Sequence, residues 1–295
     1  MKRVQGAHPE VAEGHQVAEG HEVGHEVDRA THVPLLVPGE NRMPQAAFVE
    51  QVMGLPVSFH VRGPRAREQG VTEAVAAALA RLRADDAEFS TYRAGSAVIR
   101  IQHGLLSLDD ASPRLRRVAA LCEEASARTD GAFSAWLPRD GRRLFDPTGL
   151  VKGWAVHESF ELLLADLRPL GAHDLLVVAG GDVALSCART DTPDWVVGVE
   201  DPRDRNRLLL QLPMRRGAVA TSGTAARGLH VIDPRTGSPA AALLSATVVG
   251  PGLMWADVDA TALLACGGDA PWFARHPQHA ALLVRPDGST RRLGG

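Results

Sequence analysis

Apolar positions recur along the first half of the chain with two different periods. Alternation predicts a strand over residues 52–61, and a spacing of three to four predicts a helix over residues 72–82. A short strand is predicted over residues 97–101 and a polar loop over residues 138–143. Ser112 followed by Pro113 is typical of a helix start, and that helix is predicted to end at Thr129-Asp130-Gly131.

The second half alternates two predicted helices with many short apolar runs. The helices cover residues 152–167 and 256–266. Strands are predicted over residues 175–178, 183–187, 195–199, 208–212, 218–221, 229–232, 243–249 and 281–284. Consecutive strands without helices between them favour antiparallel pairing, so the predicted class is α+β, with largely antiparallel sheets and packed helices. The Gly180-Gly181-Asp182 turn lacks the three-glycine spacing of a dinucleotide-binding fold, and no helix follows it.

Residues 1–45 differ from the rest of the chain. They contain a degenerate repeat of His, Glu and Gly and few large apolar residues, so burial cannot offset the entropy of ordering them. A disordered tail is predicted there, with a single domain over residues 46–295. Repeated histidines can collect a transition metal, but here their spacing is irregular and no cysteine accompanies them.

Composition excludes several classes of function. The chain has 295 residues, 45% of them hydrophobic, with a formal net charge of -3. No basic stripe is visible, which argues against a nucleic-acid partner, and no apolar run is long enough for membrane insertion. Three cysteines in apolar surroundings, with no export segment at Met1–Gly6, predict a cytoplasmic protein with free thiols.

Polar residues gather in the segment 228–239. His230, Asp233, Arg235, Thr236 and Ser238 lie between two apolar runs. They fit either a strand that ends in a solvated turn or part of a ligand site.

Two other segments are open to similar pairs of interpretations. Asp257 and Thr261 are four apart on a predicted helix, where a carboxylate and a hydroxyl suit magnesium; alternatively Asp257 caps the helix. Asp146 and Lys152 flank a helix start that could hold a phosphate, or they could belong to a capped helix after a surface turn.

Read in order, seven segments resemble the FAD:protein FMN transferases, also described as thiamine-biosynthesis lipoproteins. The resemblance spans from about Met53 to the end. It rests on Phe89-Ser-Thr-Tyr92, Thr129-Asp-Gly-Ala-Phe133, Asp146 to Gly153, Gly180-Gly-Asp182, Val219-Ala-Thr-Ser-Gly223, His230-Val-Ile-Asp-Pro-Arg-Thr-Gly237, and Ala256-Asp257 with Thr261.

The resemblance implies an enzyme that binds FAD and Mg²⁺ in a flavin-binding cleft. It would pass FMN to a Ser or Thr of a flavin-acceptor protein and release AMP. Asp257, Thr261 and the main-chain carbonyl near Gly149 would hold the metal, and His230 with Asp257 would be catalytic. The residues implied to line the FAD site are Met53, Tyr92, Ala132, Phe133, Ser134, Asp146, Lys152 and Val231.

The chain departs from the family pattern at the flavin side. Ser134 stands where the family usually has Asp, and only eleven residues separate Ser134 from Asp146, where many members carry a longer insertion. Asp259 is a further acidic residue near Thr261, but it faces elsewhere on the predicted helix. Two alternatives stay open: an FAD pyrophosphatase that yields FMN and AMP, and a non-catalytic FAD-binding protein.

Overall fold

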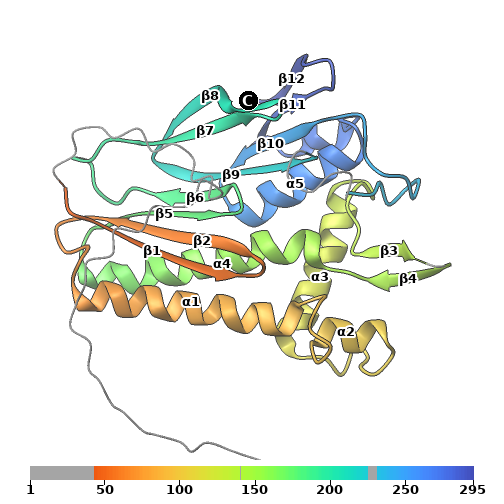
Figure 1. Ribbon diagram of the computed structural model, residues 1–295, viewed down its shortest axis with the longest axis horizontal. Coiled ribbons are helices and arrows are strands. Elements are labelled where there is room, and N and C mark those ends of the chain that lie inside the picture. Colours follow the sequence, from red (N-terminus) through yellow and green to blue (C-terminus); the bar gives the residue numbers. More distant parts are fainter. Residues whose placement is uncertain (1–42, 140, 225–230) are drawn as a thin grey trace, which may run out of the picture. The chain divides into compact units, whose positions relative to one another are not determined.

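A computed structural model describes residues 43–139, 141–224 and 231–295. Its main feature is an eight-stranded sheet, with the order β1-β2-β5-β6-β9-β10-β11-β12, in which every neighbouring pair is antiparallel (Figure 1). The strands are β1 Gln45–Val52, β2 Leu55–Arg62, β5 Asp174–Ala179, β6 Asp182–Ser186, β9 Arg216–Gly223, β10 Ser245–Gly250, β11 Ala280–Val284 and β12 Thr290–Gly294. The predicted α+β class with antiparallel pairing is confirmed.

Three long helices cover one face of this sheet. They are α1 (Gln69–Phe89), α4 (Thr148–Leu167) and α5 (Leu253–Ala265). The opposite face is covered by a hairpin of β7 (Trp195–Asp201) and β8 (Asp204–Met214). The remaining elements are α2 Ala97–Gln102, α3 Pro113–Arg128, β3 Trp136–Arg139, β4 Arg142–Phe145 and two 3-10 turns, η1 Arg168–Leu170 and η2 Pro271–Arg275.

The two-sided burial explains why β5 reads as a continuous apolar run. Leu175 and Val177 belong to the core beneath the helices, whereas Leu176 and Val178 pack with Trp195 under the β7–β8 hairpin. A strand covered on both faces has no solvent side and therefore no polar alternation.

Positive backbone φ angles mark the tight turn between β1 and β2. Met53 has φ 56° and Gly54 has φ 73°, so this two-residue loop has the geometry favoured in hairpins. The predicted strand over residues 52–61 is therefore wrong as a single element. Its first residue ends β1 and the rest belongs to β2, because the turn residues interrupt an otherwise alternating pattern.

Three other local predictions need correction. Residues 97–101 form helix α2 instead of a strand, because the Ser96 hydroxyl accepts the Ile99 N–H and caps a helix start. Residues 138–139 and 142–143 of the predicted polar loop belong to strands β3 and β4, which pair with each other. In the predicted strand 229–232, residues 229 and 230 lie outside the described residues, and Ile232 makes only an isolated bridge with Pro239.

Helix α3 begins where the sequence predicted. Ser112 caps it through a hydrogen bond from the Leu115 N–H, and Pro113 occupies the first turn. Of the predicted tail, all but residues 43–45 lies outside the described residues. Within the described part of the chain, no helix combines the length and apolar character needed to cross a bilayer.

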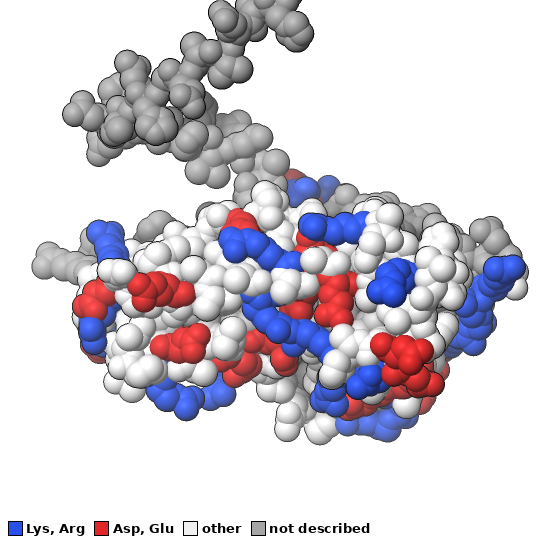
Figure 2. Space-filling view, turned by 90° about the horizontal axis from the view of Figure 1, so that it is seen from below, with Lys and Arg blue, Asp and Glu red and all other residues white. Residues whose placement is uncertain are grey.

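Charges of both signs are mixed on the face that includes α1. Figure 2 shows basic and acidic side chains interspersed there. Two ion pairs on this helix are Arg83 with Glu50 and Asp86 with Arg93. Such pairs neutralise each other locally, so the face shown in Figure 2 presents no large patch of one sign.

Candidate active site

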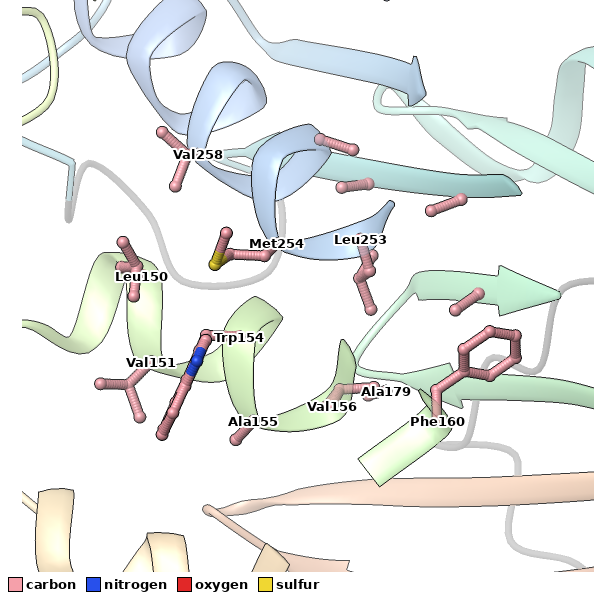
Figure 3. Packing of buried hydrophobic residues seen from close by; sticks show 14 of the residues in the cluster. Leu150, Val151, Trp154, Ala155, Val156, Phe160, Ala179, Leu253, Met254 and Val258 are labelled. Carbon is pink, nitrogen blue, oxygen red and sulfur yellow. The ribbon is translucent and has the colours of Figure 1, made fainter. Parts of the chain in front are cut away.

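Helices α4 and α5 approach each other closely at Gly153 and Asp257. A Cβ atom on Gly153 would lie 2.6 Å from Asp257 Oδ2 and 2.8 Å from the Asp257 Cβ, so only glycine allows this approach. Figure 3 shows Met254 of α5 pointing toward α4. The crossing therefore holds the Asp257 carboxylate against the first turns of α4, where Gly149 lies about one turn before Gly153.

The Asp257 carboxylate is buried with one oxygen unsatisfied. The residue is 2% exposed, Oδ1 lies 3.1 Å from Lys152 Nζ, and Oδ2 has no hydrogen-bond partner within the described part of the chain. Burial raises the pKa of Asp257 to about 7, and the Lys152 charge offsets this only in part. A buried oxygen without a side-chain partner is costly, and this carboxylate lies directly against the Gly153 backbone of α4.

Lys152 joins two buried carboxylates. Its ammonium group bonds Asp182 Oδ2 as well as Asp257, and both acidic side chains are almost fully buried while the lysine is 26% exposed. Burial by itself would lower the pKa of Lys152, but the two carboxylates outweigh it and raise that pKa. The Asp182 carboxylate is held from the other side by the Thr221 N–H at 3.0 Å.

Hydroxyl groups from β9 and β10 extend this polar region. Thr261, one turn after Asp257 on α5, lies 2.9 Å from Ser222 through their Oγ atoms. The neighbouring Thr221 is exposed, and its hydroxyl lies 2.9 Å from that of Thr247. Carboxylate and hydroxyl oxygens from α5 and β9 thus lie close together, which is the kind of donor set that a hard divalent cation prefers.

The structure places the predicted residues of the flavin segment in the core and in a local turn. Ala132 and Phe133 are 1% and 3% exposed, and a Cβ on Gly149 would lie 3.1 Å from the Phe133 ring. The Ser134 hydroxyl accepts the Trp136 N–H at 3.0 Å. Segment 132–134 therefore packs next to the start of α4, with its serine engaged in its own turn.

Asp146 occupies the turn that precedes α4. Its Oδ1 accepts hydrogen bonds from the Thr148 N–H at 3.1 Å and from the Thr148 hydroxyl at 2.6 Å. The carboxylate thus binds the first residue of the helix, although the N-cap of α4 is Pro147 and no side chain caps the helix.

The other predicted flavin-site residues lie on separate segments. Met53 is half-buried at the β1–β2 turn, and Tyr92, after α1, is 96% exposed. Val231 is half-buried, with its carbonyl bonded to the Ala240 N–H at 2.9 Å. His230 lies outside the described residues. The structure thus brings together Gly149, Lys152, Asp257 and Thr261, which had been predicted from separate motifs.

A second buried carboxylate lies on the other side of α5. Asp259 is 0% exposed and bonds Arg128 through both oxygens at 3.2 Å, His276 Nδ1 at 3.0 Å and His279 Nδ1 at 2.6 Å. Burial opposes its ionisation, but the bonds from His279 and Arg128 prevail and lower the pKa of Asp259.

The ligand atoms of Asp259 and the two histidines lie within 4.8 Å of one another, a spacing that could hold a metal ion. Both oxygens of the Asp259 carboxylate, however, already accept hydrogen bonds from Arg128, and its Oδ2 is also bonded to both histidines, so neither oxygen is free for a metal. We therefore interpret these four side chains as a packing network, called the Asp259 network below. It links α5 to the end of α3 and to the segment after η2.

About half of the chain matches the model of a known protein family. The ApbE family model matches residues 135–283, which is more than half of the chain. The chain belongs to the ApbE family. The resemblance inferred from the seven motifs is thereby confirmed.

This ApbE-family chain is 31% identical to the FAD:protein FMN transferase of Rhodobacter capsulatus over 148 residues, which are 46% of the chain. The match spans 28% of the length of that relative. Among solved structures, the ApbE protein of Thermotoga maritima has a TM-score of 0.69 at 20% identity, covering 84% of this chain and 97% of the other. The flavin transferase ApbE of Vibrio cholerae has a TM-score of 0.66 at 22% identity, covering 85% and 97%. These two structures show that the fold is shared.

Several polar residues of the site were not assigned from the sequence. Asp182 was noted only as part of a Gly-Gly-Asp turn, and Thr221, Ser222 and Thr247 received no role. A signal was present in each case, since a polar residue interrupts or ends a strongly apolar strand. What could not be read from the sequence is that β6, β9 and β10 bring these residues to the same helices.

Proposed function

We propose that this chain is a magnesium-dependent FAD:protein FMN transferase that passes FMN to a Ser or Thr hydroxyl of an acceptor protein. The observation that carries the proposal is the buried Asp257 oxygen without a partner, held against the Gly149–Gly153 turn of α4 beside a lysine. Membership of the ApbE family and the Rhodobacter capsulatus relative support the same reaction. The three free cysteines fit a cytoplasmic location.

The residues present fit Mg²⁺. Asp257 supplies an unsatisfied buried carboxylate oxygen, Thr261 supplies a hydroxyl one turn later, and the main chain at Gly149 supplies a carbonyl from the start of α4. We assign these three as the ligands. When bound, Mg²⁺ stabilises negative charge on phosphate oxygens as a pyrophosphate linkage is broken.

The chain's own residues position FAD and the acceptor. Lys152 directs a positive charge toward the phosphates at the start of α4, whose free N–H groups favour an anion. Met53, Tyr92, Asp146, Val231 and the segment 132–134 are the proposed flavin contacts. Burial around Asp257 limits access of bulk water and strengthens the electrostatic contact between Lys152 and Asp257.

The reaction exchanges the pyrophosphate linkage of FAD for a phosphate ester. The acceptor hydroxyl oxygen forms a bond to the phosphorus of the FMN half, and the bond between that phosphorus and the bridging oxygen breaks, so that AMP leaves. The hydroxyl proton must pass to a base, for which we propose His230 because imidazole titrates near neutrality.

The test is incubation of the purified full chain with FAD and Mg²⁺, with and without a candidate acceptor encoded by a neighbouring gene. We expect covalent flavin fluorescence on the denatured acceptor, with release of AMP, and its loss in EDTA. FMN and AMP released without acceptor would replace the proposal with FAD hydrolysis. Bound FAD that is never cleaved would identify a binding protein.

A further inference from the structure

Lys152 is chemically unusual in this chain. Lys2 and Lys152 are the only lysines among the 32 basic residues Lys and Arg, so arginine supplies nearly all other positive charge. Arginine presents a flat fork that prefers paired, planar contacts, whereas an ammonium group is a compact point charge. The position between Asp182 and Asp257 thus holds the side chain that most resembles a small cation.

The ammonium group contacts the same carboxylate that we assign to Mg²⁺. Lys152 Nζ lies 3.1 Å from Asp257 Oδ1, and the other oxygen of that carboxylate has no partner within the described residues. Two cations on one buried carboxylate repel each other strongly, because a nearly dry site screens charge poorly. A metal ion at Asp257 and the ammonium in its present position therefore oppose each other.

Asp182 provides the ammonium group with a second ion-pair partner. Its Oδ2 makes the closer of the two contacts with Lys152, and its Oδ1 is fixed by the Thr221 N–H at 3.0 Å. Asp182 is 1% exposed, so it is a rigid anchor and not a surface charge. The lysine side chain is 26% exposed, so part of it faces solvent.

We propose that Lys152 is a resident counter-ion of the metal site, which occupies Asp257 when the metal is absent and is retained by Asp182 when the metal enters. This inference rests on the proposed metal site. Two consequences follow. Metal binding must displace the ammonium from Asp257, and this displacement lowers the affinity for the metal.

The lysine content allows a direct test on the full chain. Protein labelled with [ε-¹³C]lysine gives two signals, from Lys2 and Lys152, and Lys2 serves as the internal reference. In a titration with Mg²⁺ alone, we expect the Lys152 signal to shift and saturate with the metal while the Lys2 signal stays in place. The Lys152→Gln variant identifies the signal by its loss.

Calorimetry with Mg²⁺ gives the second measurement. Removing a like charge from the site in Lys152→Gln should tighten Mg²⁺ binding at least about tenfold. Lys152→Arg, the matched control that keeps the charge, should remain close to the wild-type affinity. Circular dichroism confirms that each variant is folded, and the wild-type NMR titration does not depend on any variant folding.

The outcomes separate this inference from the proposed metal site. If Asp257→Asn abolishes Mg²⁺ binding but the Lys152 signal does not move in the wild type, or Lys152→Gln binds no tighter, the counter-ion role is refuted and the metal site stands. If neither wild type nor Lys152→Gln binds Mg²⁺, both are refuted.

Discussion

Asp257 and Asp259 are two buried carboxylates on one helix, and they have opposite surroundings. Asp259 is 0% exposed, and both of its oxygens are bonded within the Asp259 network. Asp257 is 2% exposed, but one of its oxygens has no partner in the described part of the chain. Because a buried charge is costly unless it is paired, the fold accounts for the satisfied carboxylate, whereas the unsatisfied one is the proposed metal ligand.

Helix geometry separates the two. Residues two apart on an α-helix project about 200° apart around its axis, so they cannot share a face. Asp257 faces Gly153 of α4, while Asp259 faces Arg128 at the end of α3. The same 13-residue helix thus serves the proposed chemistry on one side and the packing of the fold on the other.

The largest expected effect is the loss of activity in Asp257→Asn. Removing the charge removes the main ligand of the proposed metal, so we expect FMN transfer to fall at least about 1000-fold, equivalent to several kcal/mol of transition-state stabilisation. Thermal stability should stay the same or rise, because a buried charge with incomplete pairing is lost. Initial rates of flavin transfer and a melting curve measure the two effects. Near wild-type transfer would remove Asp257 from the metal site.

At Asp259, in contrast, we expect a loss of stability. Asp259→Ala leaves the Arg128 charge and two histidines without their acceptor, so unfolding free energy should fall by about 3–5 kcal/mol. Urea unfolding measures it, with Arg205→Ala as the control, because the exposed Arg205–Glu200 pair should contribute less than about 1 kcal/mol. A loss at Asp259 no larger than this control would contradict the structural role of the network.

A smaller, pH-dependent effect is expected from His276. Burial and the Arg128 charge lower the pKa of His276, although Asp259 opposes the shift. The unfolded chain then binds a proton at a higher pH than the folded one. The contribution of His276 to stability should therefore decrease as pH falls below about 6.5, by up to about 1.4 kcal/mol per pH unit for one proton, whereas Asp85 and Asp257, whose pKa values burial raises to about 7, contribute in the opposite direction.

The sign of the His276 contribution is tested by comparing the slope of unfolding free energy between pH 7 and 5 in wild type and in His276→Asn. Relative to wild type, His276→Asn should lose less stability as pH falls, even though it also lowers stability throughout, because it loses a bond to Asp259. His103→Asn, at the exposed end of α2, should retain the wild-type slope. His60 is half-buried and its pKa is also lowered by burial, so it should contribute to the slope in the same direction in His276→Asn. An equal slope in wild type and His276→Asn would overturn the prediction.

Element types followed from local signals where those signals were unambiguous. The Ser112-Pro113 start of α3 and the apolar run of β5 were both correct, because a cap and an apolar stretch are properties of neighbouring residues. The strand predicted over residues 97–101 was wrong. These residues include β-branched side chains, which are common in strands, but Ser96 caps a helix there. The β1–β2 turn was missed because Met53 is an unusual residue for a positive φ.

By itself, the sequence determined that Asp257 and Thr261 share a helical face, since a spacing of four residues depends only on the helix. It also determined membership of a recognisable family through the order of its motifs. Only the tertiary structure decided that Lys152 joins Asp182 and Asp257, and that Asp259 is paired while Asp257 is not. These contacts join segments far apart in the chain, so they depend on how the helices pack on the sheet and not on any local pattern of residues.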